Sequence, residues 1–69
     1  MVFNYSKLRG KIREVFKNEA KFAEAMGFSS ATISAKLNNR LQFSQNEMNK
    51  ACELLEIDKK EITVYFFTL

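Results

Sequence analysis

Helix-capping residues recur at short intervals along this chain, and they constrain its fold more than any other feature of the sequence. Five Asn, Ser or Asp residues each precede a segment with helical periodicity, where the side chain can accept hydrogen bonds from the exposed amides of a first turn. These residues are Asn4, Asn18, Ser29, Ser44 and Asp58. Two of them also open a capping box with an acidic residue three positions on, Ser44 with Glu47 and Asp58 with Glu61. A chain of 69 residues with five such starts is expected to form a series of short helices.

Hydrophobic staples support the same helix starts. In a staple, the apolar residue before the cap packs against another apolar residue four positions into the helix. Every cap except Asn18 is flanked in this way, by the pairs Phe3 and Leu8, Phe28 and Ile33, Phe43 and Met48, and Ile57 and Ile62. Together with the apolar periodicity, these signals predict an all-α, five-helix fold that makes a single domain over residues 1–69. The helices are expected over about 5–17, 19–26, 30–38, 45–56 and 59–69.

The first and second helices have clear apolar faces. Leu8, Ile12, Val15 and Phe16 are spaced as a buried stripe of the first helix, and we interpret the basic residues off this stripe as a solvated face. The second helix is predicted to end at Gly27, a residue suited to the left-handed position after a helix.

The last predicted helix is the ambiguous one. Ile62, Tyr65, Phe66 and Leu69 are spaced for a helix, whereas Ile62, Val64 and Phe66 alternate as in a strand. The predicted capping box before this segment favours a short helix, and a terminal strand is the alternative.

The residue inventory excludes most catalysis. The chain has no His, one Asp and one Cys, so neither a zinc site nor a nucleophile with a general base can be assembled. We therefore expect no enzyme activity, no metal, no cofactor and no small-molecule ligand. Cys52 lies on the apolar stripe of its helix and is expected in the core. No segment approaches the ~20 apolar residues of a membrane span, and the N-terminal residues lack the order of a signal peptide, which predicts a cytoplasmic protein.

Charge is distributed unevenly along the chain. Residues 1–40 carry eight basic and three acidic side chains, whereas residues 41–69 carry three basic and five acidic ones. Between Glu24 and Glu47 there is no acidic residue, and that stretch contains ten Ser, Thr, Asn or Gln side chains as well as Lys36 and Arg40. Such a surface offers hydrogen-bond donors without carboxylate repulsion, which suits a polyanion.

Residues 19–38 have the pattern of a helix-turn-helix, with a tight turn at Gly27. The second helix of this unit has only Ile33 and Leu37 as large apolar residues, so most of its circumference is expected to be uncovered and able to enter the major groove of DNA. Contacts with base edges are predicted for Ser30, Ala31, Thr32 and Ala35. Contacts with phosphates are predicted for Asn18, Ser34, Lys36, Asn38, Asn39, Arg40 and Gln42.

The run from Asn18 to Ser34, NEAKFAEAMGFSSATIS, resembles the helix-turn-helix signature of lambda-repressor-like and Cro-like regulators. Matching positions are held by Ala23, Gly27, Ser29 and Ile33. The resemblance covers about residues 18–57, and the rest of the chain is similar to small phage-borne Cro-type proteins that consist of this domain alone. It implies a compact five-helix domain that binds operator DNA as a dimer without a cofactor, in a bacterial cell and encoded by a phage or prophage.

Four positions depart from the pattern of that family. Glu19 stands where the family commonly has a Gln that contacts a phosphate, and Asn39 replaces the usual Gly after the second helix of the unit. Ala31 and Ala35 stand where related regulators often carry longer base-reading side chains, so apolar contact and DNA shape are expected to contribute more to specificity.

Double-stranded DNA and a second copy of the chain are therefore the expected partners, and the chain is predicted to be a sequence-specific transcriptional regulator. The aromatic C-terminal segment supplies the candidate dimer contacts, although Phe66 can also close the core: Tyr65, Phe66, Phe67 and Leu69. The alternative is a protein-interaction module, such as an antirepressor or the DNA-binding partner of a toxin.

Overall fold

Five α-helices and one turn of 3₁₀-helix follow one another along residues 2–69, the part of the chain that the computed structural model describes. They are α1 (Ser6–Phe16), α2 (Glu19–Met26), α3 (Ser30–Leu37), α4 (Gln45–Leu55), η1 (Lys59–Glu61) and α5 (Ile62–Phe66). Within this described range no strand forms, so the predicted all-α fold is confirmed and the strand alternative for the C-terminal segment is wrong. The helical path of η1 and α5 directs the Phe66 side chain into the core, where it is 1% exposed.

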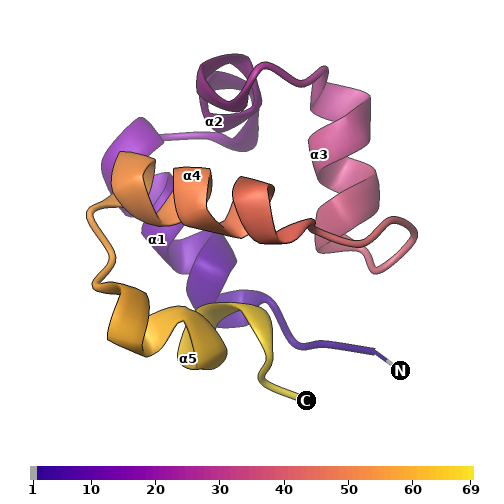
Figure 1. Cartoon of the computed structure of the whole chain (residues 1–69). Helices are drawn as coiled ribbons and strands as arrows, with labels where there is room; N and C mark the ends of the chain where they lie inside the picture. The colour runs from indigo at the N-terminus through magenta and orange to yellow at the C-terminus, as the bar shows by residue number, and fades with distance from the viewer. Residues whose placement is uncertain (1) are drawn as a thin grey trace.

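The helices enclose one core and leave both chain ends on the same side of the molecule (Figure 1). In that view α4 crosses the centre and lies in front of α1. Above it is α2, to the right is α3, and below it is α5. The first and last segments run side by side, joined by a hydrogen bond from the Asn4 amide to the Thr68 carbonyl at 2.6 Å. No helix in residues 2–69 has the length and apolar character needed to cross a membrane.

Four of the five predicted caps form, three of them at the start of an α-helix and one, Asp58, at the start of η1. The side chains of Asn18, Ser29 and Ser44 each accept from the amide three residues on, at 2.9 to 3.1 Å. At Ser44 the capping box is complete, because the Glu47 carboxylate also accepts from the Ser44 amide at 2.8 Å. These bonds satisfy amides that a helix start otherwise leaves without a partner.

The predicted cap at Asn4 and the predicted capping box at Asp58 do not form. Asn4 accepts from the amide of Ser6, only two residues on, so it makes a turn before α1 and the helix begins one residue later than an Asn4 cap would require. The Asp58 side chain caps η1 by accepting from the amide of Lys60, but the reciprocal hydrogen bond of a capping box, from the Asp58 amide to the Glu61 side chain, does not form in this segment. The reason is that the first turn here is 3₁₀-helical, which brings the second amide rather than the third toward the cap.

The core is built from apolar residues of all five α-helices. Its largest fully buried side chains are Leu8, Ile12, Phe22, Ile33, Cys52, Leu55 and Phe66. One residue of the predicted stripe of α1 is not covered, since Val15 is 36% exposed. Phe16 covers that end of the core in its place, with its ring 5.6 Å from the ring of Phe22.

Candidate nucleic-acid interface

Gly27 makes the turn that joins α2 to α3, as predicted. Its φ of 84° is in the left-handed region, and its amide closes the last turn of α2 by bonding to the carbonyls of Ala23 and Glu24. The next amide, from Phe28, also bonds to the Ala23 carbonyl, at 2.8 Å, and Ser29 then caps α3. A residue with a Cβ atom adopts this conformation with difficulty, so glycine allows two helices to be joined by so short a turn.

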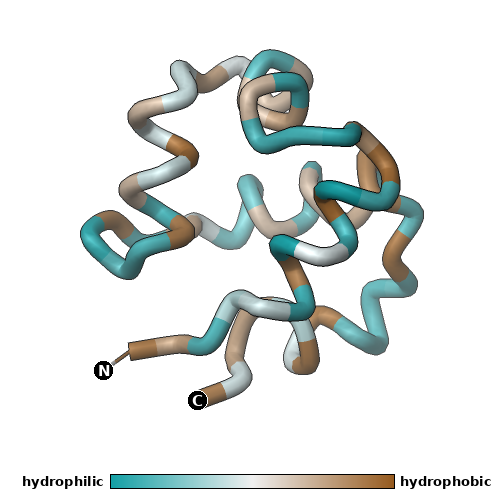
Figure 2. The backbone as a smooth tube through the Cα atoms, turned by 180° about the vertical axis from the view of Figure 1, so that it is seen from behind, coloured by the Kyte–Doolittle hydropathy of each residue, from teal (hydrophilic) through white to brown (hydrophobic). Residues whose placement is uncertain are grey.

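α3 buries few apolar side chains and leaves small ones outside. Ile33 and Leu37 are buried, whereas Ser30 and Ala31 are exposed and Thr32 and Ala35 are partly exposed. The hydroxyl of Thr32 is not free, because it lies 2.9 Å from the hydroxyl of Ser29 in a hydrogen bond. All four residues predicted to contact base edges therefore lie at least partly on the surface of α3. Figure 2 shows α3 from behind as a segment of mostly pale, intermediate hydropathy.

Lys36 requires a correction, because it was predicted to contact a phosphate and is buried instead, with 7% of its surface exposed. Its ammonium donates to the Glu47 carboxylate and to the Gln42 carbonyl, both at 2.9 Å. The same nitrogen lies over the rings of Phe28 and Phe43, 5.3 and 5.6 Å from their centres. Two acceptors and two aromatic faces account for the charge of this lysine, so it joins α3 to α4 rather than facing solvent.

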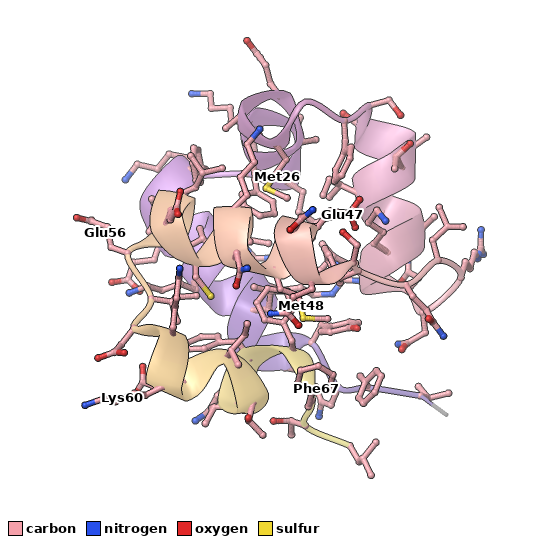
Figure 3. All side chains as sticks on the ribbon, viewed as in Figure 1. Met26, Glu47, Met48, Glu56, Lys60 and Phe67 are labelled. Atoms are coloured by element: carbon pink, nitrogen blue, oxygen red, sulfur yellow. The ribbon has the colours of Figure 1, made fainter. Side chains whose placement is uncertain are left out.

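Glu47 is the acidic partner in that contact, at the start of α4 on the side that faces α3 (Figure 3). Burial by itself would raise the pKa of Glu47, but the Ser44 amide and the Lys36 ammonium together hold that pKa below its ordinary value. The carboxylate is therefore charged at neutral pH, which matches the charge of Lys36. The structure describes no unpaired carboxylate on the exposed side of α3.

Asn39 requires a second correction. Its φ of 64° confirms that an Asn can take the left-handed turn after α3. Its side chain does not face outward, however, because it accepts from the Phe3 amide and donates to the Phe3 carbonyl, both at 2.9 Å. The side chain that was predicted to bond to a phosphate thus attaches the loop after α3 to the N-terminal segment.

Ser34 and Asn38 are exposed but bonded to each other, and Asn38 is also bonded to α1. The Asn38 amide nitrogen donates to the Ser34 hydroxyl at 3.3 Å, and the Asn38 side-chain oxygen accepts from Arg9 at 3.0 Å. Arg9 also pairs with Glu19 at 2.7 Å and donates to the Leu37 carbonyl at 3.2 Å. Arg9 was interpreted as part of a solvated face, and no local sequence signal could have indicated partners 10 and 29 residues away.

The remaining phosphate candidates lie at two places. Arg40 and Gln42 are exposed in the loop after α3, and within residues 2–69 the Arg40 guanidinium bonds to no other side chain. Asn18 is exposed at the start of α2, with its side-chain oxygen already bonded to the Lys21 amide. A recess of about 170 Å³ lies beside Asn18, and its lining carries three cations and one carboxylate: Arg9, Arg13, Lys17 and Glu19.

The aromatic dimer candidates divide into one core residue and three surface residues. Phe66 is buried, with its ring 5.2 Å from that of Phe43, so its predicted place in an interface is corrected to a place in the core. Tyr65 is half-buried, and Phe67 and Leu69 are 42% and 73% exposed.

Phe67 lies beside the N-terminal segment, its ring edge-on to that of Phe3 at 5.6 Å (Figure 3). These two rings help to line an uncharged groove of about 240 Å³ that the sequence did not indicate, together with Tyr5, Asn39, Leu41 and Gln42.

Comparison with known proteins gave a matching family model and similar solved structures. A family model described as "Protein of unknown function (DUF739)" matches residues 1–69. The solution structure of the modulator of repression (MOR) of the temperate bacteriophage TP901-1 from Lactococcus lactis is 42% identical in sequence, with a TM-score of 0.85. The match covers 97% of this chain and 90% of that one. The comparison with curated proteins gave no match.

Proposed function

We propose that this chain, which belongs to the DUF739 family, regulates the repression state of a temperate bacteriophage or prophage by binding operator DNA through α3. The proposal places it with the lambda-repressor-like and Cro-like regulators that its sequence resembles. It is supported by the similarity to a phage modulator of repression over nearly the whole of both chains. The observation that carries the DNA-binding part is the carboxylate-free exposed side of α3, presented by the Gly27 turn next to exposed Arg40.

In the proposed complex, α3 enters the major groove and the loop after it contacts the backbone. Ser30, Ala31 and Ala35 are small enough for a close approach, and the Thr32 methyl can contact a thymine methyl although its hydroxyl is bonded to Ser29. Arg40, Gln42 and the start of α2 at Asn18 are left for the phosphates. Base recognition then rests mainly on apolar contact and shape, with few bidentate hydrogen bonds.

The binding experiment compares DNA adjacent to the chain's own coding region with a random duplex of equal length at several salt concentrations. The expected result is tighter binding to the adjacent DNA, with an affinity that falls steeply with salt. Arg40→Ala is expected to weaken binding to both duplexes alike and to reduce the salt slope by about 1. Lys60→Ala is the matched control, because Lys60 is an exposed cation of η1.

Two changes on α3 test its place in the complex. Ala31→Glu adds a carboxylate to the exposed side of α3, and Thr32→Ser removes the methyl group while keeping the hydroxyl that is bonded to Ser29, so both are expected to lower binding to adjacent DNA more than to random DNA. Thr63→Glu adds the same charge at an exposed position of α5 and is expected to have little effect on binding to either duplex. Equal losses on both duplexes for the two α3 changes would contradict the assigned roles, and equal affinity of the unmodified chain for both duplexes would contradict the DNA-binding proposal.

A homodimer is the proposed binding form, with the two copies of α3 in successive major grooves about 34 Å apart. Phe67 and Leu69, next to half-buried Tyr65, supply exposed apolar surface for the contact. The mass of the chain in solution and on DNA tests this point. A chain that is monomeric at micromolar concentration and binds DNA as a monomer would contradict it.

A protein-interaction module, such as an antirepressor, is the second candidate. The observation that favours it is the small number of free polar groups on α3 and in the loop after it, since Lys36 and Asn39 are bonded inside the molecule and Ser34 and Asn38 are bonded to each other. The uncharged groove beside Phe67 offers a separate surface for a protein. Loss of a copurifying protein on Phe67→Ser, with no effect of Arg40→Ala, would favour this candidate over DNA binding.

A further inference from the structure

Arg9 connects three helices through a single guanidinium group. Its Nη1 donates to Glu19 Oε2 at 2.7 Å, at the first residue of α2. Its Nη2 donates to the Leu37 carbonyl at 3.2 Å and to the Asn38 side-chain oxygen at 3.0 Å, both at the end of α3. The Arg9 and Glu19 side chains are 33% and 35% exposed, so water screens the pair only in part. We call Arg9, Glu19, Asn38 and Ser34 the Arg9 cluster.

The position of this cluster makes it a second connection between α2 and α3. The end of α2 is already joined to the start of α3 by the turn at Gly27. The Arg9 cluster joins the opposite ends, the start of α2 and the end of α3, through a residue of α1. Two helices joined at both ends cannot change their crossing angle without breaking one of the connections.

The electrostatics of the helix ends favour the same arrangement. Glu19 is an anion at the start of α2, where exposed amides carry partial positive charge, and Arg9 is a cation at the end of α3, where carbonyls carry partial negative charge. The Leu37 carbonyl is among the last four of α3, which have no partner within the helix. A planar guanidinium can serve a carboxylate and two other acceptors at fixed angles, and an ammonium cannot reproduce that geometry.

The cluster also reaches the exposed side of α3. Asn38 accepts from Arg9 and donates to the Ser34 hydroxyl at 3.3 Å, so its amide group is held in one orientation between them. Ser34 therefore presents its hydroxyl next to Asn38 rather than in a freely rotating direction.

We propose that Arg9 is a positioning residue that fixes the orientation of α3, and with it the directions of Ser34 and Asn38, relative to α1 and α2. This inference rests on the proposed function where it concerns DNA: a correctly oriented α3 discriminates between sequences, whereas phosphate contacts hold any DNA. Arg9 contributes to the selectivity of binding without contacting a base itself.

The test uses two substitutions that conserve charge on the same helix. Arg9→Lys keeps the cation and removes the planar geometry, and Arg13→Lys is the matched control at an exposed position outside the cluster. Amide resonances of Ser30–Leu37 and of the Asn38 side chain are expected to shift in Arg9→Lys and to stay in place in Arg13→Lys. If Arg9→Lys does not fold by circular dichroism, Glu19→Gln replaces it, since it keeps an acceptor and removes only the charge, with smaller shifts of the same resonances expected.

The DNA measurement uses the adjacent and random duplexes described above, at one salt concentration and then as a salt series. Arg9→Lys is expected to reduce the preference for adjacent DNA by about tenfold and to leave the salt slope unchanged, because the charge is unchanged. A loss of thermal stability alone, with the preference intact in the folded variant, would overturn the role in selectivity.

The outcomes separate this inference from the proposed function. If the unmodified chain shows no preference for adjacent DNA, the proposed function fails, and the resonances of α3 then decide the positioning role without DNA. Unmoved α3 resonances in a folded Arg9→Lys variant, or equal shifts in Arg13→Lys, would overturn the positioning role whatever the chain binds.

Discussion

The surface around α3 and the surface around the two termini are held in place by different kinds of contact. Around α3, directional hydrogen bonds and ion pairs orient the polar side chains. Arg9 of α1 makes them at the end of α3, and Lys36 makes them on its inner side. Around the termini, aromatic rings meet edge to face, as Phe3 does with Phe67 and Phe43 does with Phe66. A directional contact determines where a side chain points, whereas ring packing mainly fills volume and leaves apolar surface at its margin.

Function is expected to follow this division. A surface that recognises a ligand by the direction of its groups needs the first kind of contact, and the proposed DNA-binding side has it. The side of the termini has exposed apolar residues next to an uncharged groove, which suits contact with protein. Asn39 joins the two regions, since it belongs to the loop after α3 and bonds to Phe3.

The largest effect is expected from the aromatic region. Phe66→Ala removes a ring that is 1% exposed and should lower the free energy of unfolding by about 3 to 5 kcal/mol. The neighbouring Phe67→Ala removes a ring that is 42% exposed and should cost about 1 kcal/mol. Urea unfolding followed by circular dichroism measures both. Similar losses for the two variants would show that the region does not divide into a core residue and a surface residue.

The next effect is expected at the inner side of α3. Lys36→Ala leaves Glu47 without its cation and should cost about 2 to 3 kcal/mol, less than a fully buried pair because the Glu47 side chain is partly exposed. Lys36→Met keeps most of the contact with Phe28 and Phe43 and should cost less, so the difference reports the charge. Lys60→Ala is an exposed control. The same unfolding assay applies, and a loss for Lys36→Ala no larger than for Lys60→Ala would contradict the structural role of this lysine.

Asn39 tests the connection between the two regions. Asn39→Ala loses two hydrogen bonds to Phe3 and puts a less tolerant residue at a φ of 64°, so a loss of about 2 kcal/mol is expected. Asn39→Gly loses the same bonds but suits the turn, so a loss of about 1 kcal/mol is expected. Thermal unfolding of the two variants measures the difference. An Asn39→Gly variant as stable as the unmodified chain would show that the bonds to Phe3 contribute nothing.

The smallest effect is expected from acid. The pKa of Glu47 in the folded chain lies below its ordinary value, so its contribution to stability is fully present above the unfolded pKa of about 4.3 and is lost as pH falls through the folded pKa. The stability difference between the unmodified chain and Glu47→Gln should therefore shrink as pH is lowered from 7 toward 3. Unfolding in urea at a series of pH values measures it, and a difference that is constant with pH would contradict the assignment.

Much of the fold could be predicted because its signals are local. The caps at Asn18, Ser29 and Ser44 and the turn at Gly27 depend on bonds across three to five residues, and all four form as expected. The cap at Asn4 and the capping box at Asp58 did not form, and they show the limit of such signals. Asn4 and Asp58 have the right residue type, but the turn that follows each brings a different amide within reach.

The candidate site could be predicted less completely. The sequence located α3 and its small, carboxylate-free surface, but it could not tell which polar side chains were free. Lys36 and Asn39 are residue types that can bind phosphates. In the fold, however, Lys36 bonds to a residue 11 positions away and Asn39 to a residue 36 positions away. Arg9 is a residue type expected on a solvated surface, yet it bonds to the end of α3, 28 residues away.

By itself, the sequence determined the five helices, their main starts and the residues that α3 turns toward the core, since helical periodicity and capping act within a few residues of the chain. The tertiary structure alone decided which polar groups are used inside the molecule and which face outward. A hydrogen-bonding side chain takes whichever partner the fold brings within about 3 Å, and that partner has no fixed distance along the sequence. The same amino acid is therefore a free surface group in Arg40 and a connection between helices in Arg9.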